Sequence, residues 1–497
     1  MDGQTNDFSN EEIKINRELS IWEALIPVIA LVGMLAYNVF VFGDASLDGS
    51  NQFILLLGGA VAAIVGYFNK VGFTKIIDEI ASNIQSTAGA ILILLMVGAL
   101  AGTWLVSGII PTMIYYGLQI LNPTIFLAAS LIICSVISVA TGSSWTTSAT
   151  VGIALIGISE ALGISVGMTA GAVISGAYFG DKLSPLSDTT NLAPAMAGTD
   201  LFTHIQYMLY TTIPTYLITL VFFIILGFNI DPTGTASTQS ILNSIENSFY
   251  VTPWLFVVPV VVIFLIVKKT PPLVALLLGT LLAAVAALIF QPELVATIGG
   301  SENLNFLSGY KGIMQAITVK VSVATDNVDL NDLFTSGGMA GMMGTIWLIL
   351  CAMVFGGAMD AIGALARISK SLLNLFHTTF GLFASTVISC LALNVTASDQ
   401  YLAIVVPGKM FSKAFKDKGL APENLSRTLE DSGTVTSALI PWNTCGAYQS
   451  GVLGVPVASY FAYAMFNYLS PFMTLLVAAF SIKIRTLKPQ PEEIVSE

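Results

Sequence analysis

Apolar segments long enough to cross a lipid bilayer recur along almost the whole of this 497-residue chain. A helix needs about 20 mainly apolar residues to cross about 30 Å of hydrocarbon. Hydrophobic residues make up 55% of the sequence, charged residues only 10%, and the mean hydropathy is +0.81. Such a chain has too few polar side chains to cover a water-soluble domain of this length. The sequence therefore predicts an all-α integral membrane protein.

The apolar segments number about seven in each half of the chain, and no linker or low-complexity tract separates them. We predict about 10–14 membrane segments, with broken helices and re-entrant hairpins among them. They lie near residues 22–42, 52–69, 89–108, 123–140, 145–165, 167–203, 204–228, 250–267, 272–291, 339–359, 380–395, 398–412, 426–454 and 456–482. The expected order is an N-terminus (1–21), a first transmembrane repeat (22–228), an external linker (229–249), a second repeat (250–482, with an external loop at 292–336) and a C-terminus (483–497).

The distribution of charge indicates the orientation of the chain. In membrane proteins, Lys and Arg are more frequent in the short cytoplasmic loops than in the external ones. If the N-terminus lies in the cytoplasm and successive segments cross the membrane in opposite directions, most basic residues fall in cytoplasmic loops. Only Lys311 and Lys320 then fall in external loops. The cytoplasmic set is Lys14, Arg17, Lys70, Lys75, Lys268, Lys269, Arg367, Lys370, Lys409, Lys413, Lys416, Lys418, Arg427, Lys483, Arg485 and Lys488. Both termini are therefore predicted to be cytoplasmic. The net charge of −11, without a basic patch, argues against nucleic acid as a partner.

The two halves of the chain resemble one another in sequence. The stretch from Ser130 to Ser144 aligns with Ser385 to Asp399 at a constant offset of about 255 residues. A second match, at an offset of about 250 residues, pairs Asp181, Ser184, Ser187 and Asn191 with Asp431, Thr434, Ser437 and Asn443. An odd number of segments per half makes the repeats inverted. Chance similarity between apolar segments is the alternative, but inverted repeats are typical of transporters and agree with the charge distribution.

Four polar runs interrupt the apolar segments, two in each half. They cover residues 141–148, 180–191, 394–400 and 430–444. Lipid offers no hydrogen bonds, so such runs must be buried in protein or line a cavity. Pro185, Gly433 and Pro441 are expected to break the helices and leave backbone carbonyls facing the site. Hydroxyl, amide, carboxylate and carbonyl oxygens suit a small hard cation such as Na⁺.

Two carboxylates are the leading candidate ligands. Asp188 follows the break at Pro185, and Asp399 lies at the matching turn of the second half. A carboxylate that binds either a proton or a sodium ion couples the two gradients by competition. Asp181 and Asp431 complete the predicted cation-binding and proton-coupling set. The supporting ligands are Ser143, Ser144, Thr146, Ser187, Thr189, Thr190, Asn191, Thr396, Ser398, Thr434, Ser437 and Asn443.

Each of these assignments has a structural alternative. Asp188 could cap a helix, Asp399 could lie in a satisfied polar turn, and the hydroxyls could bond to helix carbonyls. Lys182 could neutralise a carboxylate across the bundle or bind a substrate anion, and Arg427 poses the same choice. Of the neighbouring carboxylates Glu430 and Asp431, we rank Asp431 higher because it matches Asp181 in the repeat.

The polar runs strongly resemble those of the NhaC-type sodium/proton antiporters, in the ion-transporter superfamily. The similarity rests first on Gly-Asp-Lys-Leu-Ser-Pro-Leu-Ser-Asp-Thr-Thr-Asn-Leu-Ala at 180–193, and then on 102–111, 141–145, 398–401 and 430–442. It covers all but the ends and residues 292–336. The resemblance implies a multi-pass protein of the bacterial inner membrane, hairpin tips at 141–147 and 396–400, elevator-like movement and a homodimer. Similar proteins exchange malate and lactate, or amino acids.

Sodium/proton antiport by alternating access is the function that these features favour. The alternative is sodium- and proton-coupled exchange of a small organic acid or amino acid, with Lys182 or Arg427 holding a carboxylate. A channel is disfavoured because breaks at corresponding positions of the two halves suit alternating access better than a continuous pore. We predict that the chain is not an enzyme and binds no cofactor. Its expected partners are membrane lipid, Na⁺ and H⁺, and the only metal expected is Na⁺ at the cation site.

Overall fold

The computed structural model is helical almost throughout and describes residues 19–42, 49–120, 122–230, 235–268, 270–325, 331, 334–373 and 378–487. Four basic residues used for the predicted orientation, Lys14, Arg17, Lys269 and Lys488, lie outside these ranges. The first part of the chain forms α1 (Ile21–Phe42), α2 (Ser50–Phe68), α3 (Phe73–Ser86), α4 (Ala88–Val106), α5 (Ile109–Ile120), α6 (Pro123–Thr141), α7 (Ser144–Thr147), η2 (Ser148–Gly152), α8 (Ile153–Ala161), α9 (Val166–Leu183), α10 (Asp188–Ala197) and α11 (Leu201–Phe228).

The second part of the chain is also helical apart from one short hairpin. It forms α12 (Thr235–Ser248), η3 (Pro253–Phe256), α13 (Val257–Val267), α14 (Pro272–Phe290), α15 (Pro292–Ile298), α16 (Phe306–Thr318), β1 (Val321–Ser322), β2 (Thr335–Ser336), α17 (Gly338–Gly341), α18 (Met343–Ala361), α19 (Ala364–Leu373), α20 (Thr379–Thr396), α21 (Gln400–Asp417), α22 (Pro422–Leu429), η5 (Glu430–Thr434), η6 (Ser437–Leu439), α23 (Thr444–Leu453), α24 (Val457–Phe461) and α25 (Met465–Ala479). Strands β1 and β2 pair antiparallel, with Val321 opposite Ser336.

Eight helices in the described ranges are long and apolar enough to cross a membrane: α1, α2, α4, α6, α11, α14, α18 and α20. A bent pair of helices at 241–248 and 253–267 would make a ninth span. The predicted all-α membrane class is therefore confirmed. The predicted number of 10–14 segments is larger because it also counted broken segments. The structure shows two of these: residues 167–203 are divided into α9, α10 and the start of α11, and residues 426–454 are divided into four shorter elements. The inverted relation between the halves remains a prediction.

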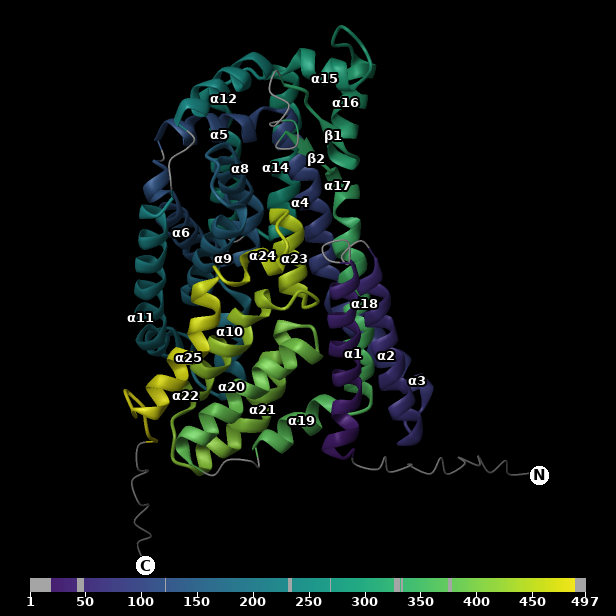
Figure 1. The fold of residues 1–497 in the computed structure, drawn as a ribbon, viewed down its shortest axis with the longest axis vertical. Coiled ribbons are helices and arrows are strands. Elements are labelled where there is room, and N and C mark those ends of the chain that lie inside the picture. The colour runs from purple at the N-terminus through teal and green to yellow at the C-terminus, as the bar shows by residue number, and fades with distance from the viewer. Residues whose placement is uncertain are drawn as a thin grey trace, which may run out of the picture.

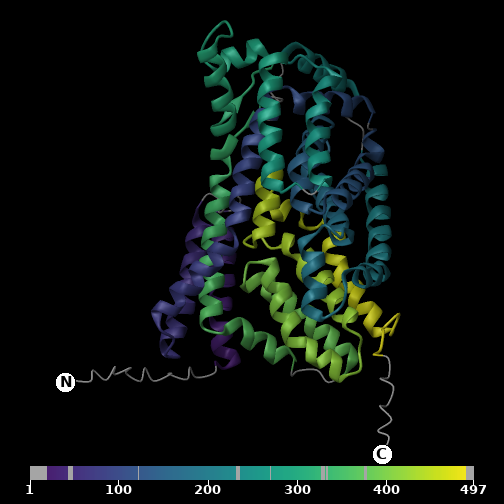
Figure 2. The same cartoon turned by 180° about the vertical axis from the view of Figure 1, so that it is seen from behind.

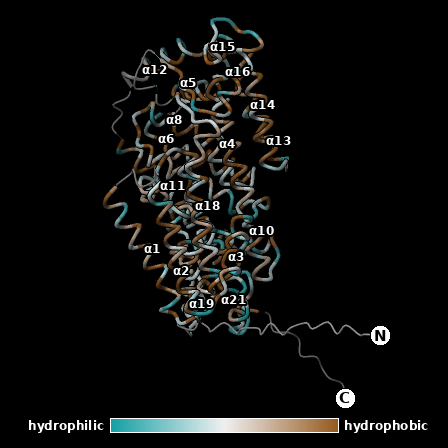
Figure 3. Tube along the Cα trace, turned by 90° about the vertical axis from the view of Figure 1, so that its right-hand side faces the viewer, coloured by the Kyte–Doolittle hydropathy of each residue, from teal (hydrophilic) through white to brown (hydrophobic). Residues whose placement is uncertain are grey.

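The helices form an elongated bundle in which distant parts of the sequence meet (Figure 1). Helices α12, α15 and α16 lie at one end, and α19, α21 and α22 lie at the other, as the view from behind also shows (Figure 2). The predicted external loop at 292–336 thus carries α15, α16 and the short β hairpin. Hydrophobic residues run along the length of the bundle (Figure 3), as expected where helices face lipid.

Close packing of α9 on α6 positions the polar break that follows α9. A Cβ atom added at Gly180 would lie 2.5 Å from the Ser135 carbonyl oxygen and 2.5 Å from the Val139 nitrogen, both on the α6 backbone. Only a glycine allows the two backbones to approach this closely. Because Asp181 follows directly, this contact determines how far the carboxylate lies from the end of α6.

Replacing Gly180 with alanine is therefore expected to destabilise the protein by about 1–3 kcal/mol, since α9 must move away from α6. The measurement is the melting temperature of the purified variant in detergent. Gly344→Ala is the control, because its added Cβ meets nothing within 4 Å. Equal melting temperatures for the two variants would contradict this account of the α6–α9 contact.

Candidate functional site

A cavity of about 550 Å³ lies where the breaks of the first half meet the start of α21. Its lining includes two carboxylates and a set of hydroxyl and amide side chains. The polar residues are Ser86, Thr141, Ser143, Ser144, Thr146, Asp181, Ser187, Asp188, Thr189, Thr270, Gln400 and Tyr401. None of the described residues that line this cavity is basic. The cavity therefore presents negative charge and oxygen ligands, which suit a cation.

The first break in the chain closes one wall of the cavity. Helix α6 ends at Gly142, whose φ of 69° is in the left-handed region, and a Cβ there would lie 2.5 Å from the Cβ of Leu186. The next residue, Ser143, begins α7 by accepting a hydrogen bond from the Thr146 N–H at 3.1 Å. The glycine thus lets the chain reverse and brings the hydroxyls of 143–146 into the cavity wall.

Asp181, in the last turn of α9, is the buried carboxylate of the cavity. Its Oδ2 atom accepts hydrogen bonds from the Ser144 N–H at 3.1 Å and from the Ser144 hydroxyl at 2.6 Å. The carboxylate therefore lies at the N-terminus of α7, where free N–H groups stabilise negative charge. Asp181 is 8% exposed, so this charge is held in a largely dehydrated position that still opens to the cavity.

The second break, residues 184–187, carries Asp188 at its end. Ser187, rather than Asp188, is the N-cap of α10, because its hydroxyl accepts from the Thr190 N–H at 3.4 Å. Asp188 itself is exposed and lines the cavity. The Thr190 hydroxyl donates to the carbonyls of Asp181 and Lys182, and the Asn191 amide donates to Ser187 and Pro185 carbonyls. Thr190 and Asn191 therefore hold the break together.

In the second half, Asp399 begins a helix. Its Oδ1 atom accepts from the N–H groups of Tyr401 at 2.8 Å and Leu402 at 3.1 Å, at the start of α21. This is the N-cap geometry of a satisfied polar turn. Asn443 plays the same part for α23 by accepting from the Cys445 N–H at 3.0 Å, and its amide donates to the Asn394 carbonyl. These two N-caps stabilise the backbone at the breaks of the second half, just before α21 and α23.

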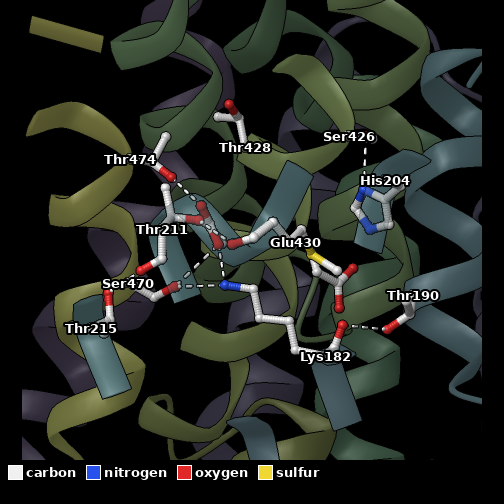
Figure 4. Close-up of polar contacts among 12 residues, drawn as sticks. Lys182, Thr190, His204, Thr211, Thr215, Ser426, Thr428, Glu430, Ser470 and Thr474 are labelled. Atoms are coloured by element: carbon white, nitrogen blue, oxygen red, sulfur yellow. Dashed lines mark hydrogen bonds and ion pairs between the residues drawn. The ribbon is translucent and has the colours of Figure 1, made fainter. Parts of the chain in front are cut away.

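Lys182 is fully buried and forms an ion pair with the fully buried Asp431. The same carboxylate accepts hydrogen bonds from Ser470 and Thr474 of α25, and the Lys182 ammonium also donates to Ser470 at 3.2 Å. Figure 4 shows Lys182 pointing toward Ser470 and Thr474. The pair therefore joins α9 to η5 and α25, with each charge neutralised inside the bundle.

Two ionisable neighbours of this pair, Glu430 and Arg427, have fewer contacts. The Glu430 Oε1 atom accepts from the Thr189 hydroxyl at 3.0 Å, whereas its buried Oε2 atom has no hydrogen-bond partner. Arg427 is fully buried with its guanidinium 4.5 Å from the centre of the Tyr207 ring, and none of its three nitrogens has a partner in the described structure. Arg427 is not among the residues that line the cavity.

The structure brings part of the predicted set together. Seven predicted residues line the cavity: Asp181, Asp188, Ser143, Ser144, Thr146, Ser187 and Thr189. The other predicted residues are not part of the cavity lining: Lys182, Thr190, Asn191, Thr396, Ser398, Asp399, Arg427, Asp431, Thr434, Ser437 and Asn443. Of these, Thr396 and Ser437 donate to helix carbonyls. The cavity also includes Gln400 and Tyr401, which the predicted site left out although both follow Asp399 directly.

Comparisons with known proteins agree with this chemistry. A sequence profile of the Na⁺/H⁺ antiporter family matches residues 176–482, which include the second break and all of the second half's polar runs. The chain is similar to an uncharacterised Na⁺/H⁺ antiporter of Haemophilus influenzae, at 34% identity over 94% of this chain and 97% of that protein. It is similar to the Na⁺/H⁺ antiporter NhaC of Alkalihalophilus pseudofirmus, at 35% identity over 85% and 89% of the two chains. The malate-2H⁺/Na⁺-lactate antiporter of Bacillus subtilis is 35% identical over 93% of each chain.

Proposed function

Because this chain belongs to the Na⁺/H⁺ antiporter family, we infer that it is a sodium/proton antiporter and propose that exchange takes place in the Asp181 cavity. The observation that carries the proposal is the lining of that cavity, where two carboxylates and several hydroxyls converge without a basic residue among the described lining residues. Carboxylate and hydroxyl oxygens are hard ligands that fit sodium. A multi-pass transporter, rather than an enzyme, is the class to which the chain belongs.

We propose that Asp181 binds sodium or a proton, but never both. Ser144 donates two hydrogen bonds to one oxygen of the Asp181 carboxylate, and Asp181 lines the cavity together with Ser187 and Thr189. A sodium ion arriving at the carboxylate displaces a proton, and the reverse exchange follows on the other side of the membrane. Asp188, exposed at the cavity wall, attracts cations toward the site. No covalent step and no cofactor is required.

Alternating access needs the same residues to face each side of the membrane in turn. We propose that the polar breaks of the two halves form the moving part, with an elevator-like displacement against a scaffold in a homodimer. The chain is a multi-pass membrane protein, and we propose that it lies in the bacterial inner membrane with both termini in the cytoplasm.

Exchange of an organic acid is the second candidate function, because the Bacillus subtilis relative is a malate-2H⁺/Na⁺-lactate antiporter. A cavity of about 550 Å³ has the volume of a small-molecule site. However, the basic groups that would hold a carboxylate are not available there. Lys182 is paired with Asp431, and Arg427 lies against Tyr207 outside the cavity lining. Charge therefore favours the cation.

The two candidate functions are separated by the pH inside proteoliposomes loaded with a pH-sensitive dye. We expect an inward sodium gradient, applied without any organic solute, to make the lumen alkaline as protons leave. Vesicles without protein control for leakage, and a potassium gradient of equal size controls for ionic strength. A response that requires malate or lactate would transfer the assignment to organic-acid exchange. No response under either condition would refute both functions.

A further inference from the structure

Glu430 is a buried carboxylate that is incompletely satisfied. It is 0% exposed and is the first residue of η5, a wide π-helical turn between α22 and η6. The Thr189 hydroxyl supplies its single hydrogen bond, at 3.0 Å to Oε1, and Oε2 has no partner in the described structure. Isolated π-helical turns within helices are frequent at functional sites. Burying an ionised carboxylate with so few contacts costs several kcal/mol, unless a positive group compensates or the carboxylate takes up a proton.

Neither of the neighbouring basic residues forms an ion pair with Glu430 in the described structure. The Lys182 ammonium binds the adjacent carboxylate, Asp431, together with Ser470. Arg427 lies one helical turn before Glu430, but its guanidinium stacks over the Tyr207 ring and makes no hydrogen bond in the described structure. Asp431, by contrast, forms an ion pair with Lys182 and accepts hydrogen bonds from Ser470 and Thr474. The two adjacent carboxylates therefore differ in their environments: Asp431 has a basic partner, and Glu430 has none in the described structure.

Thr189 connects Glu430 to the cavity. Its side chain lines the cavity with Asp181 and Ser187, and the same hydroxyl donates to Glu430. The Ser187 and Thr189 hydroxyls are 3.1 Å apart. Three oxygen-bearing side chains, Ser187, Thr189 and Glu430, thus follow one another from the cavity to the buried carboxylate. A small hard cation could exchange one oxygen ligand for the next along this row.

We propose that Glu430 is a second carboxylate ligand of the transported cation, reached from the Asp181 cavity through Thr189, and that the Lys182–Asp431 pair is a structural link. The proposal rests on the proposed function, because the cation is the antiporter's own cargo. It assigns the cation to the carboxylate that the sequence ranked lower. A structural ion pair between Glu430 and Arg427 is the competing account, and it predicts equal effects of removing either residue.

The test is binding of radioactive sodium to the purified protein in detergent at one fixed pH, paired with sodium-driven proton movement in proteoliposomes. We expect Glu430→Gln to weaken sodium binding by about 100-fold, the effect of losing one charged ligand in a dehydrated site. Glu430→Asp keeps the charge on a shorter side chain and should recover part of the binding. Arg427→Gln should bind sodium within about threefold of wild type, a difference below 1 kcal/mol.

Melting temperatures and size-exclusion profiles check that each variant is folded, and Glu430→Asp keeps the test valid if Glu430→Gln does not fold. Wild-type sodium affinity in Glu430→Gln, with antiport intact, would overturn the proposal. Equal losses in Glu430→Gln and Arg427→Gln, with no further loss in the double variant, would assign Glu430 to an ion pair instead. If the wild-type protein neither binds nor exchanges sodium, the proposed function itself fails, which distinguishes the two failures.

Discussion

Replacing Asp431 alone with asparagine is expected to destabilise the protein by about 3–5 kcal/mol, because it leaves a buried ammonium group without its counter-charge. Lys182 and Asp431 are both fully buried, and their ion pair lies among the hydroxyls of Ser470 and Thr474. Lys182→Met alone should have an effect of similar size, since it leaves Asp431 charged and unpaired. The measurement is the melting temperature in detergent, together with the fraction of protein that elutes as a single species.

The double variant Lys182→Met with Asp431→Leu provides the matched control. It removes both charges at once and replaces them with apolar groups, which is often neutral or even stabilising. We therefore expect it to recover most of the stability lost in either single variant and to retain sodium-driven proton movement. A stable double variant without exchange would show that the pair takes part in transport. Single variants as stable as the double variant would refute the structural coupling.

Replacing Asp181 with asparagine is expected to reduce sodium-driven proton movement by about 100-fold or more, since a charged ligand lost from a dehydrated site costs about 3 kcal/mol. Asparagine retains an acceptor oxygen for the Ser144 N–H and hydroxyl, so the start of α7 should remain folded. The initial rate of the dye signal in proteoliposomes, at saturating and limiting sodium, measures the loss.

Asp188→Asn is the comparison variant for Asp181→Asn. Asp188 lines the same cavity but is exposed, so its charge is hydrated and contributes less to binding. We expect its rate to fall by no more than about fivefold, close to 1 kcal/mol. A larger loss in Asp188→Asn than in Asp181→Asn would instead favour Asp188 as the principal ligand, which is the order that the sequence alone indicated.

The sequence predicted the features that arise from local chemistry. Apolar runs separated by polar stretches predict membrane helices whatever their neighbours are, because lipid excludes unpaired backbone groups. Pro185 marked a break that the structure contains between α9 and α10, since the backbone preference of proline acts within a few residues. The resemblance of residues 180–193 to the NhaC-type antiporters is confirmed by the relatives that match most of the chain.

The roles of individual carboxylates were harder to predict, because caps and ion pairs depend on contacts. Asp188 and Asp399 both follow breaks in the sequence, yet the structure exposes one at the cavity and uses the other to begin α21. A serine directly before Asp188 could as easily be the cap as Asp188 itself, and only the backbone geometry distinguishes them. The sequence left both roles open for this reason.

The sequence by itself thus determined the membrane class, the positions of the polar breaks and the oxygen-rich chemistry that a cation requires. Only the tertiary structure decided which carboxylates are neutralised within the protein and which remain available. Lys182 and Asp431 are 249 residues apart, and Thr189 and Glu430 are 241 residues apart. Their partnerships exist because α9 and α10 pack against η5 and α25, and such packing depends on the whole bundle rather than on the residues within any single segment.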